Sequence, residues 1–283
     1  MNYKLVAFDL DGTLLNSQHR ISKNTLEIIK MLKSMGVCIV IATGRSFNAC
    51  IYYGKLIQAD YIIACNGAFT YDRNNKTISN KLPLNKELAK EVLDILYNYS
   101  TDLKIQWDSI STYYSNNITP FEKNYINNYL KDFPEETFNF KIIEKKEEIE
   151  KFNEEIYQIF FHPMGENMNI YKNVLYDIQK YSGLNVVDFK ENYTDLNHQT
   201  ASKGKSLQDV AKKLDIKNDE IMVFGDGNND LSMFEYAGLS VAMDNATEEI
   251  KQIANHITLC NDDEGVKKAL VKMFNLNDFL VSE

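Results

Sequence analysis

Cysteine is scarce in this sequence of 283 residues, and its four cysteines lie far apart: Cys38, Cys50, Cys65 and Cys260. Three of them adjoin apolar runs. Disulfide frameworks and zinc sites use more cysteines, or cysteines at short regular spacings, so the distribution argues against both. Buried, unpaired thiols are typical of a reducing compartment, and we therefore expect a cytoplasmic protein.

Long apolar stretches are also absent. No run approaches the ~18 consecutive apolar residues that a membrane-spanning helix needs. The opening residues, MNYKLVAFDLDG, lack a basic start followed by a purely apolar segment, so they do not predict a secretory leader. We therefore expect no membrane partner.

Positive charge is in deficit, with 31 lysines and arginines against 40 aspartates and glutamates and a formal net charge of −9. Binding to nucleic acid rests largely on cationic contacts with phosphates, so we expect no nucleic-acid partner. A small anionic substrate is still compatible with this balance, because a bound metal ion can reverse the local field.

Short apolar runs and helical patterns alternate at both ends of the chain. Runs at residues 5–8, 37–42 and 61–65 are matched by runs at 221–224 and 239–243. Their apolar residues are consecutive, which is typical of parallel strands whose two faces are both covered by helices. The two ends therefore predict halves of one doubly wound, Rossmann-like α/β sheet.

The middle of the chain has a different pattern. Residues 103–107 alternate as a half-exposed strand does, and scattered helical patterns surround them. This indicates a smaller α+β unit inserted into the sheet domain. We expect core domain over 1–82 and 191–283, and an inserted cap domain over 83–190.

Three of the predicted strands end in polar residues of reactive types. The first leads to Asp9, the second to Thr43-Gly44-Arg45, and the run at 221–224 to GDGNND, which contains Asp226. Ligands of an open parallel sheet bind beyond the carboxyl ends of the strands. All three groups are therefore expected at one edge of the sheet.

Two carboxylates, Asp9 and Asp11, stand one residue apart at the end of the first strand. Such crowding is tolerable when a divalent cation lies between carboxylates, and magnesium prefers one or two of them with waters and a phosphate. Asp9 and Asp226 are the expected ligands, and Gly12 allows the sharp turn that follows the strand.

Alternative interpretations of these motifs fail at single residues. A calcium loop starting at Asp9 would have Thr13 and Arg20 at ligand positions, and GDGNND lacks the third glycine of a dinucleotide fingerprint. A phosphate loop ending in GKS would need glycine where Gln199 stands. A purely structural role for Asp9 and Asp11, as turn and cap residues, is disfavoured by the second acidic cluster.

Four motifs in this order resemble those of the haloacid dehalogenase-like hydrolases: DLDGT (9–13), Thr43 in IATGR, Lys203 in ASKGKSL, and GDGNND (225–230). The insert after the third strand is similar to the mixed α/β cap of the Cof-type phosphatase subgroup. The tripeptide NGA (66–68) is also typical of that subgroup. The resemblance covers essentially the whole chain and implies a phosphoric monoester hydrolase.

The resemblance implies roles for individual residues. Asp9 would be the nucleophile that forms an aspartyl-phosphate, and Asp11 the general acid and base. Mg²⁺ would bind the carboxylates of Asp9 and Asp226 and the backbone carbonyl of Asp11. Thr43 and Lys203 would hold the phosphoryl oxygens.

Further residues are expected around this centre. Backbone N–H groups of Leu10 and Gly44, and the side chain of Asn229, would bind phosphate. Asp230 would orient Lys203 from behind, although Asn229 and Asp230 also suit a helix-capping role. Substrate contact and structural pairing remain open for Arg45 and Asn66.

The leading hypothesis is a magnesium-dependent phosphatase acting on small phosphorylated metabolites, with sugar phosphates as the expected class. One alternative is a phosphomutase that uses the same phospho-aspartate. Another is a non-catalytic protein that binds a phosphometabolite. The sequence leaves open whether the protein is a monomer or a dimer.

Overall fold

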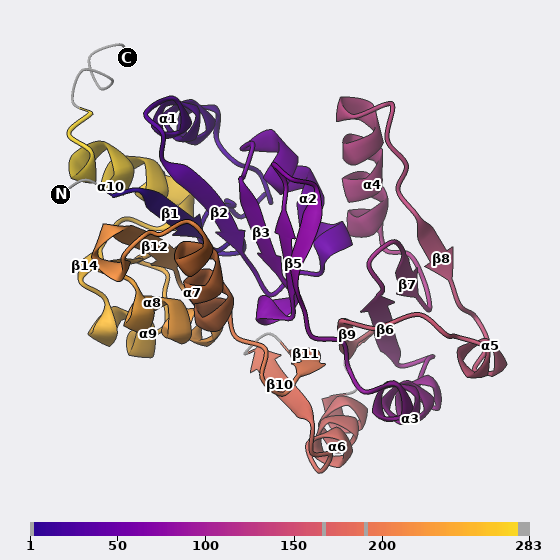
Figure 1. The fold of residues 1–283 in the computed structure, drawn as a ribbon. Coiled ribbons are helices and arrows are strands. Elements are labelled where there is room, and N and C mark those ends of the chain that lie inside the picture. Colours follow the sequence, from indigo (N-terminus) through magenta and orange to yellow (C-terminus); the bar gives the residue numbers. More distant parts are fainter. Residues whose placement is uncertain (1–2, 166–167, 190–191, 277–283) are drawn as a thin grey trace. The chain divides into compact units, whose positions relative to one another are not determined.

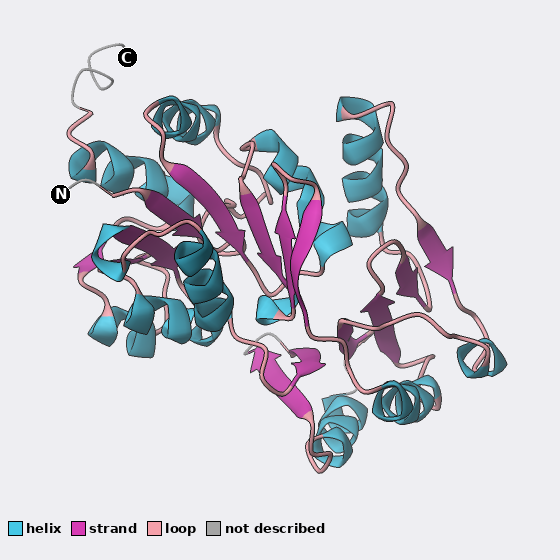
Figure 2. Ribbon diagram, in the orientation of Figure 1, coloured by secondary structure: helices cyan, strands magenta, loops and turns pink. Residues whose placement is uncertain are grey.

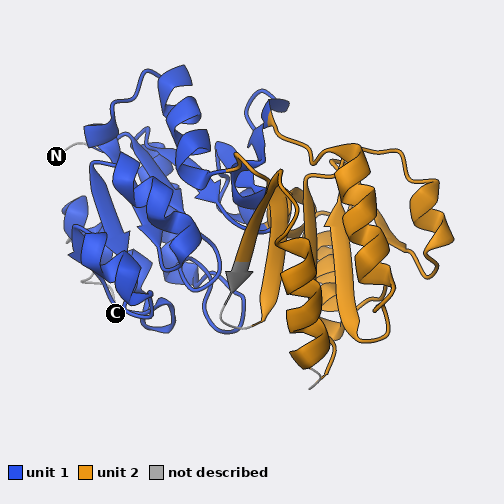
Figure 3. Cartoon of the chain, turned by 90° about the horizontal axis from the view of Figure 1, so that it is seen from below, with its two compact units in different colours: residues 1–45, 53–80, 202–283 blue, residues 46–52, 81–201 orange. Residues whose placement is uncertain are grey.

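The computed structural model describes residues 3–165, 168–189 and 192–276. The chain divides into two compact units (Figure 3). The first comprises residues 1–45, 53–80 and 202–283, and the second comprises residues 46–52 and 81–201. The range predicted for the cap, 83–190, lies within the second unit, which also takes in Ser46–Tyr52 and extends to Ala201.

The first unit is built on an eight-stranded sheet in the order β14-β13-β12-β1-β2-β3-β4-β5 (Figure 1). The strands from β14 to β3 run parallel, and β4 pairs antiparallel with β3. The strands are β1 (Leu5–Phe8), β2 (Cys38–Ala42), β3 (Tyr61–Ala64), β4 (Phe69–Asp72), β5 (Thr77–Lys81), β12 (Ile221–Gly225), β13 (Leu239–Ala242) and β14 (His256–Ile257).

Helices cover both faces of this sheet, which explains the uninterrupted apolar runs of its central strands. On one face, side chains of α7, α8 and α9 pack on alternate strand residues such as Ala7 and Val223. On the other, α1 and α10 lie against each other (Figure 1). The helices are α1 (Lys23–Ser34), α7 (Lys203–Lys213), α8 (Leu231–Tyr236), α9 (Glu248–Ile253) and α10 (Gly265–Met273), and α2 (Phe47–Leu56) crosses the division between the units.

The second unit holds a six-stranded sheet in the order β10-β11-β9-β6-β7-β8. Its neighbouring strands are antiparallel except β7 and β8. Its elements are α3 (Lys86–Tyr97), β6 (Leu103–Asp108), β7 (Tyr113–Ser115), α4 (Pro120–Asp132), β8 (Phe140–Ile142), α5 (Glu147–Glu150), β9 (Gln158–Pro163), α6 (Met168–Ile178), β10 (Leu184–Phe189) and β11 (Tyr193–His198) (Figure 2).

The two faces of this second sheet differ in chemistry. On β6, Leu103, Ile105 and Trp107 enter an apolar core with residues of α3 and α6. The alternate residues Lys104 and Asp108 lie on the opposite face, although both are buried. The half-exposed alternation predicted for 103–107 is therefore an alternation of apolar and polar environments.

The predicted fold class is confirmed: a doubly wound, mainly parallel sheet and an inserted α+β unit. Two details of the sequence analysis need correction. The strands β4 and β5 were not predicted. The apolar run at residues 155–161 predicts a strand over its whole length, whereas β9 begins only at Gln158. Among the residues that the structure describes, no helix is both long and apolar enough to cross a bilayer.

Candidate active site

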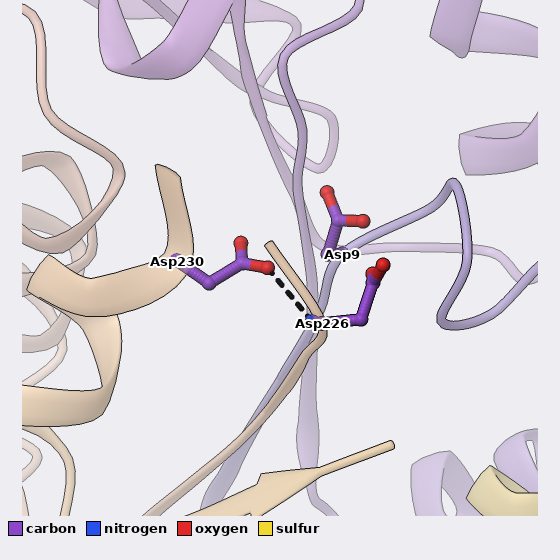
Figure 4. A group of neighbouring side chains, drawn as sticks. All are labelled: Asp9, Asp226 and Asp230. Carbon is purple, nitrogen blue, oxygen red and sulfur yellow. Dashed lines mark hydrogen bonds between the residues drawn. The ribbon is translucent and has the colours of Figure 1, made fainter. Parts of the chain in front are cut away.

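Strands β1 and β12 are neighbours at the centre of the first sheet, where the strand order reverses direction. Asp9 follows β1, and its backbone N–H donates to the carbonyl of Phe224 in β12, 3.0 Å away. Asp226 follows β12, and Asp230 ends the short turn η3 (Asn228–Asp230). One carboxylate oxygen from each of these three aspartates lies within 4.8 Å of the others (Figure 4). The switch point of the sheet thus gathers three carboxylates.

Lys203, the first residue of α7, connects two of these carboxylates. Its Nζ donates to Oδ1 of Asp9 and to Oδ1 of Asp230, both at 2.7 Å. Burial of the side chain would lower the pKa of Lys203, but the carboxylates of Asp230 and Asp9 outweigh it and raise that pKa above its ordinary value. Lys203 is therefore a permanently charged group beside Asp9.

Asp230 is fully engaged with its own unit. Its Oδ1 accepts from Lys203, and its Oδ2 accepts from the backbone N–H groups of Asp226 and Gly227 at 3.0 and 3.1 Å. The residue is completely buried. Because both oxygens are occupied, Asp230 is placed to orient Lys203 and the loop of Asp226.

The carboxylate of Asp226 is held by Thr13, a residue that the sequence analysis did not single out. Thr13 Oγ1 donates to Asp226 Oδ1 at 2.7 Å. A Cβ on Gly12, whose φ is +75°, would lie 2.4 Å from Asp226 Oδ2, so only glycine fits this turn. Burial, and next the charge of Asp230, raise the pKa of Asp226 to about 7, with the Thr13 hydrogen bond opposing them.

The donor set fits a hard divalent cation. Among the described residues, no hydrogen bond reaches Oδ2 of Asp9 or Oδ2 of Asp226, so each aspartate retains one open oxygen. Three carboxylates cluster beside one ammonium, that of Lys203, which contacts only Asp9 and Asp230, so ionisation of all three is opposed by their mutual repulsion. Burial raises the pKa of Asp9, with Lys203 opposing and Asp230 and Asp226 adding to the rise. A cation at the open oxygens would remove this repulsion.

Asp11 points to a different partner. Arg45 Nε donates to Asp11 Oδ2 and Arg45 Nη2 to Asp11 Oδ1, both at 2.6 Å, and His19 Nδ1 lies 3.6 Å from Asp11 Oδ1. Desolvation favours the neutral form of Asp11, but Arg45 and then His19 outweigh it and hold its pKa well below the usual range. In this structure Asp11 is thus an ionised partner of Arg45.

The remaining predicted residues lie in the loops that follow the central strands. Thr43 is buried after β2, and its Oγ1 accepts from the backbone N–H of Arg45 at 3.1 Å. Asn229 Nδ2 donates to Asn66 Oδ1 at 2.9 Å. Leu10 and Gly44 follow β1 and β2 respectively.

Comparison with known proteins identifies the family. Residues 6–270 match the haloacid dehalogenase-like hydrolases. The putative phosphatase YxeH of Bacillus subtilis is 31% identical over 95% of this chain and 97% of its own. The 5-amino-6-(5-phospho-D-ribitylamino)uracil phosphatase YitU of the same organism is 29% identical over 96% and 98%. The solved structure of the subclass IIB sugar phosphatase BT4131 superposes with a TM-score of 0.72, at 25% identity over 96% and 99%.

The chain therefore belongs to the haloacid dehalogenase-like hydrolases, and the predicted resemblance to its Cof-type phosphatases is confirmed. Because its relatives across their full lengths are named as phosphatases, the prediction of a phosphoric monoester hydrolase is confirmed too.

Proposed function

We propose that this protein is a magnesium-dependent phosphatase that transfers the phosphoryl group of a small metabolite to Asp9 and then to water. The observation that carries the proposal is the pair of open carboxylate oxygens on Asp9 and Asp226, next to the buried ammonium of Lys203. Three carboxylates clustered beside one ammonium would repel an anionic phosphate unless a cation compensated them.

In the first step, the Asp9 carboxylate attacks phosphorus, so that a bond from phosphorus to Asp9 forms while the bond to the leaving alkoxide breaks. Lys203 and the hydroxyl of Thr43 would hold the phosphoryl oxygens, with the leaving oxygen opposite Asp9. When bound by Asp9, Asp226 and the Asp11 carbonyl, Mg²⁺ supplies charge neutralisation for an anionic nucleophile that meets an anionic phosphate.

Asp11 supplies the proton that the leaving alkoxide takes up. Its pKa is depressed while it faces Arg45, so it must leave the guanidinium and be protonated before it acts as an acid. In the second step Asp11 accepts a proton from water, which attacks the aspartyl-phosphate. The bond from phosphorus to Asp9 then breaks and inorganic phosphate leaves.

We propose monophosphates of polyhydroxylated carbon chains, sugar phosphates first among them, as the substrate class. The support is that one relative is named for a phosphoribityl compound and another for sugar phosphates. These substrates share a phosphate on a chain of hydroxyl groups. Location in the cytoplasm and the absence of a nucleic-acid partner remain predictions.

The test measures phosphate release from an aryl phosphate with Mg²⁺, with chelator, and in the Asp9→Asn variant. We expect activity with Mg²⁺ alone and a loss of at least ~10³-fold in Asp9→Asn, since the nucleophile is gone. Activity that persists in chelator or in Asp9→Asn would contradict the mechanism. A panel of sugar and sugar-alcohol phosphates, ranked by kcat/KM, then tests the substrate class.

The same assay separates the two alternatives. A phosphomutase would release little inorganic phosphate and would require a bisphosphate activator. A non-catalytic binder would bind a phosphometabolite without turning it over. The presence of Asp9, Asp11, Lys203 and Asp226 argues against the non-catalytic binder, because binding alone needs no nucleophile and acid. A phosphomutase would use the same four residues, so the release of inorganic phosphate separates it from a phosphatase.

A further inference from the structure

The turn that follows β3, named η1 (Cys65–Gly67), has an unusual backbone. The φ angles of Cys65, Asn66 and Gly67 are +53°, +53° and +98°, so three consecutive residues lie in the left-handed region. A residue with a side chain costs of order 1–3 kcal/mol in such a conformation, which persists only when its surroundings hold it. Cys65 and Asn66 are both buried. Two strained residues in one turn call for a functional reason.

The first contact of η1 is with the loop after β2. The backbone N–H of Cys65 donates to the carbonyl of Arg45 at 2.8 Å, and that of Asn66 donates to the carbonyl of Thr43 at 3.1 Å. These bonds fix both ends of the loop that presents the Thr43 hydroxyl.

The second contact is with the start of α7. A Cβ on Gly67 would lie 2.3 Å from the carbonyl oxygen of Ser202, so the backbone of η1 packs directly on the residue before Lys203. Ser206 Oγ, one turn further along α7, donates to the carbonyl of Gly67 at 2.9 Å. The turn η1 therefore also sets where the helix of Lys203 begins.

The third contact is with η3. Asn66 Oδ1 accepts from Asn229 Nδ2 at 2.9 Å, and Asn66 is only 2% exposed. The second N–H of the Asn229 amide has no hydrogen-bond partner among the described residues. An amide turned by 180° would present an oxygen in place of these donors, and an oxygen repels phosphate. The bond to Asn66 selects the donor orientation.

We propose that Asn66 is a positioning residue that acts on phosphate binding through Asn229, an inference that rests on the proposed function. The sequence left substrate contact open for Asn66. In the structure its side-chain oxygen accepts from Asn229 and its backbone N–H donates to the carbonyl of Thr43, so both groups bond to neighbouring loops. The strained turn η1 is the template on which the loops of Thr43, Lys203 and Asn229 are assembled.

The test is a double-mutant cycle of Asn66→Gly and Asn229→Ala. Glycine accepts the left-handed backbone, so Asn66→Gly removes the amide and leaves the turn intact. Binding of inorganic phosphate in the presence of Mg²⁺ is measured by calorimetry, with kcat and KM for an aryl phosphate alongside. We expect each single variant to weaken phosphate binding roughly tenfold, and the double variant to bind no more weakly than Asn229→Ala.

Two further variants separate the side chain from the backbone. Asn66→Ala lacks the amide and also strains the turn, so it should bind phosphate as weakly as Asn66→Gly but melt at a lower temperature. Asn80→Ala removes another donor to the Gly67 carbonyl, 3.1 Å away, and serves as the control whose phosphate affinity should not change.

The outcomes distinguish this inference from the function on which it rests. Additive effects, of roughly a hundredfold in the double variant, would show that Asn66 acts independently of Asn229 and would overturn the inference alone. An unchanged affinity in Asn66→Gly would overturn it as well. A wild-type protein that neither binds phosphate nor turns over a phosphate ester in Mg²⁺ would overturn both.

Discussion

Two buried lysines, one in each unit, both contact carboxylates but have different charge environments. Lys203 and Lys104 have side-chain exposures of 0% and 2%. Lys203 faces two carboxylates, whereas Lys104 faces one, that of Glu122 at 2.9 Å, and the carbonyl of Asn117 at 2.6 Å. Burial lowers the pKa of Lys104, against the pull of Glu122, whereas the pKa of Lys203 is raised.

The difference lies in what remains unpaired around each lysine. Glu122 also accepts from the hydroxyl of Tyr113 and the backbone N–H of Thr119, so one cation balances one fully bonded anion. Around Lys203, open oxygens remain on Asp9 and Asp226, and three carboxylates accompany one ammonium. A satisfied buried network stabilises the fold, whereas an unsatisfied one is expected to bind a ligand.

The largest expected effects come from replacing either lysine with methionine. Lys203→Met should lower kcat by at least ~10³-fold, because it removes the charge that contacts Asp9 and that we propose to hold phosphate. Lys104→Met should leave kcat within about twofold but destabilise the second unit by roughly 3–5 kcal/mol, since Glu122 stays buried without its cation. Trp107, the single tryptophan, lies in the second unit, so its fluorescence in urea measures that loss. A stable Lys104→Met protein would contradict the comparison.

Replacing Asp226 should have an intermediate effect on stability, and its sign should depend on whether Mg²⁺ is present. Without metal, Asp226→Asn should raise the melting temperature, because it removes one of three repelling carboxylates. With Mg²⁺ at a hundred times its dissociation constant, the wild type should gain ~2.7 kcal/mol of stability and the variant almost none. Calorimetric scans with and without Mg²⁺ measure both shifts. An equal gain from Mg²⁺ in the two proteins would place the metal elsewhere.

A third test concerns Asp108 in the second unit. Burial, with a smaller contribution from the charge of Glu122, raises its pKa to about 7, although hydrogen bonds from Asn48 and Ser46 oppose the rise. The folded state then holds a proton that the unfolded state releases above about pH 4. Stability should therefore fall as pH rises from about 4 to 7, by up to ~1.4 kcal/mol per unit for this group.

Asp108→Asn keeps an oxygen for the Asn48 amide and removes the titration. Relative to the wild type, the variant should become steadily more stable between pH 5 and pH 7. Urea unfolding monitored by Trp107 fluorescence at each pH measures this difference. Parallel pH profiles for the two proteins would show that Asp108 is ionised in the folded state throughout this range.

Much of the first unit could be predicted because its signals are local. Buried parallel strands are consecutive apolar runs, and each reactive residue follows such a run directly, as Asp9 follows β1. The strand β5 was missed because its residues, TISNK, are mostly polar, and the tight turn before it uses Lys76 at a φ of +53° where glycine would have signalled it.

Contacts between distant segments could not be predicted. Asp11 and Arg45 stand 34 positions apart, and Thr13 and Asp226 stand 213 apart, so no spacing in the sequence indicates either pair. Thr13 had one available signal, its place inside DLDGT. The late start of β9 also has a tertiary cause, since the carbonyl of Ile156 accepts from Leu84 outside the sheet.

The borders of the first sheet have a consequence for how this protein behaves when concentrated. Its outermost strand on one side, β14, has only two residues. On the other side, β5 carries alternating exposed side chains and ends at Lys81. Long, flat, apolar borders invite a second chain to add on and begin aggregation. Within the described residues, neither edge strand is long and apolar. Although the interior of the sheet is highly apolar, its edges therefore offer a second chain little opportunity to add a strand.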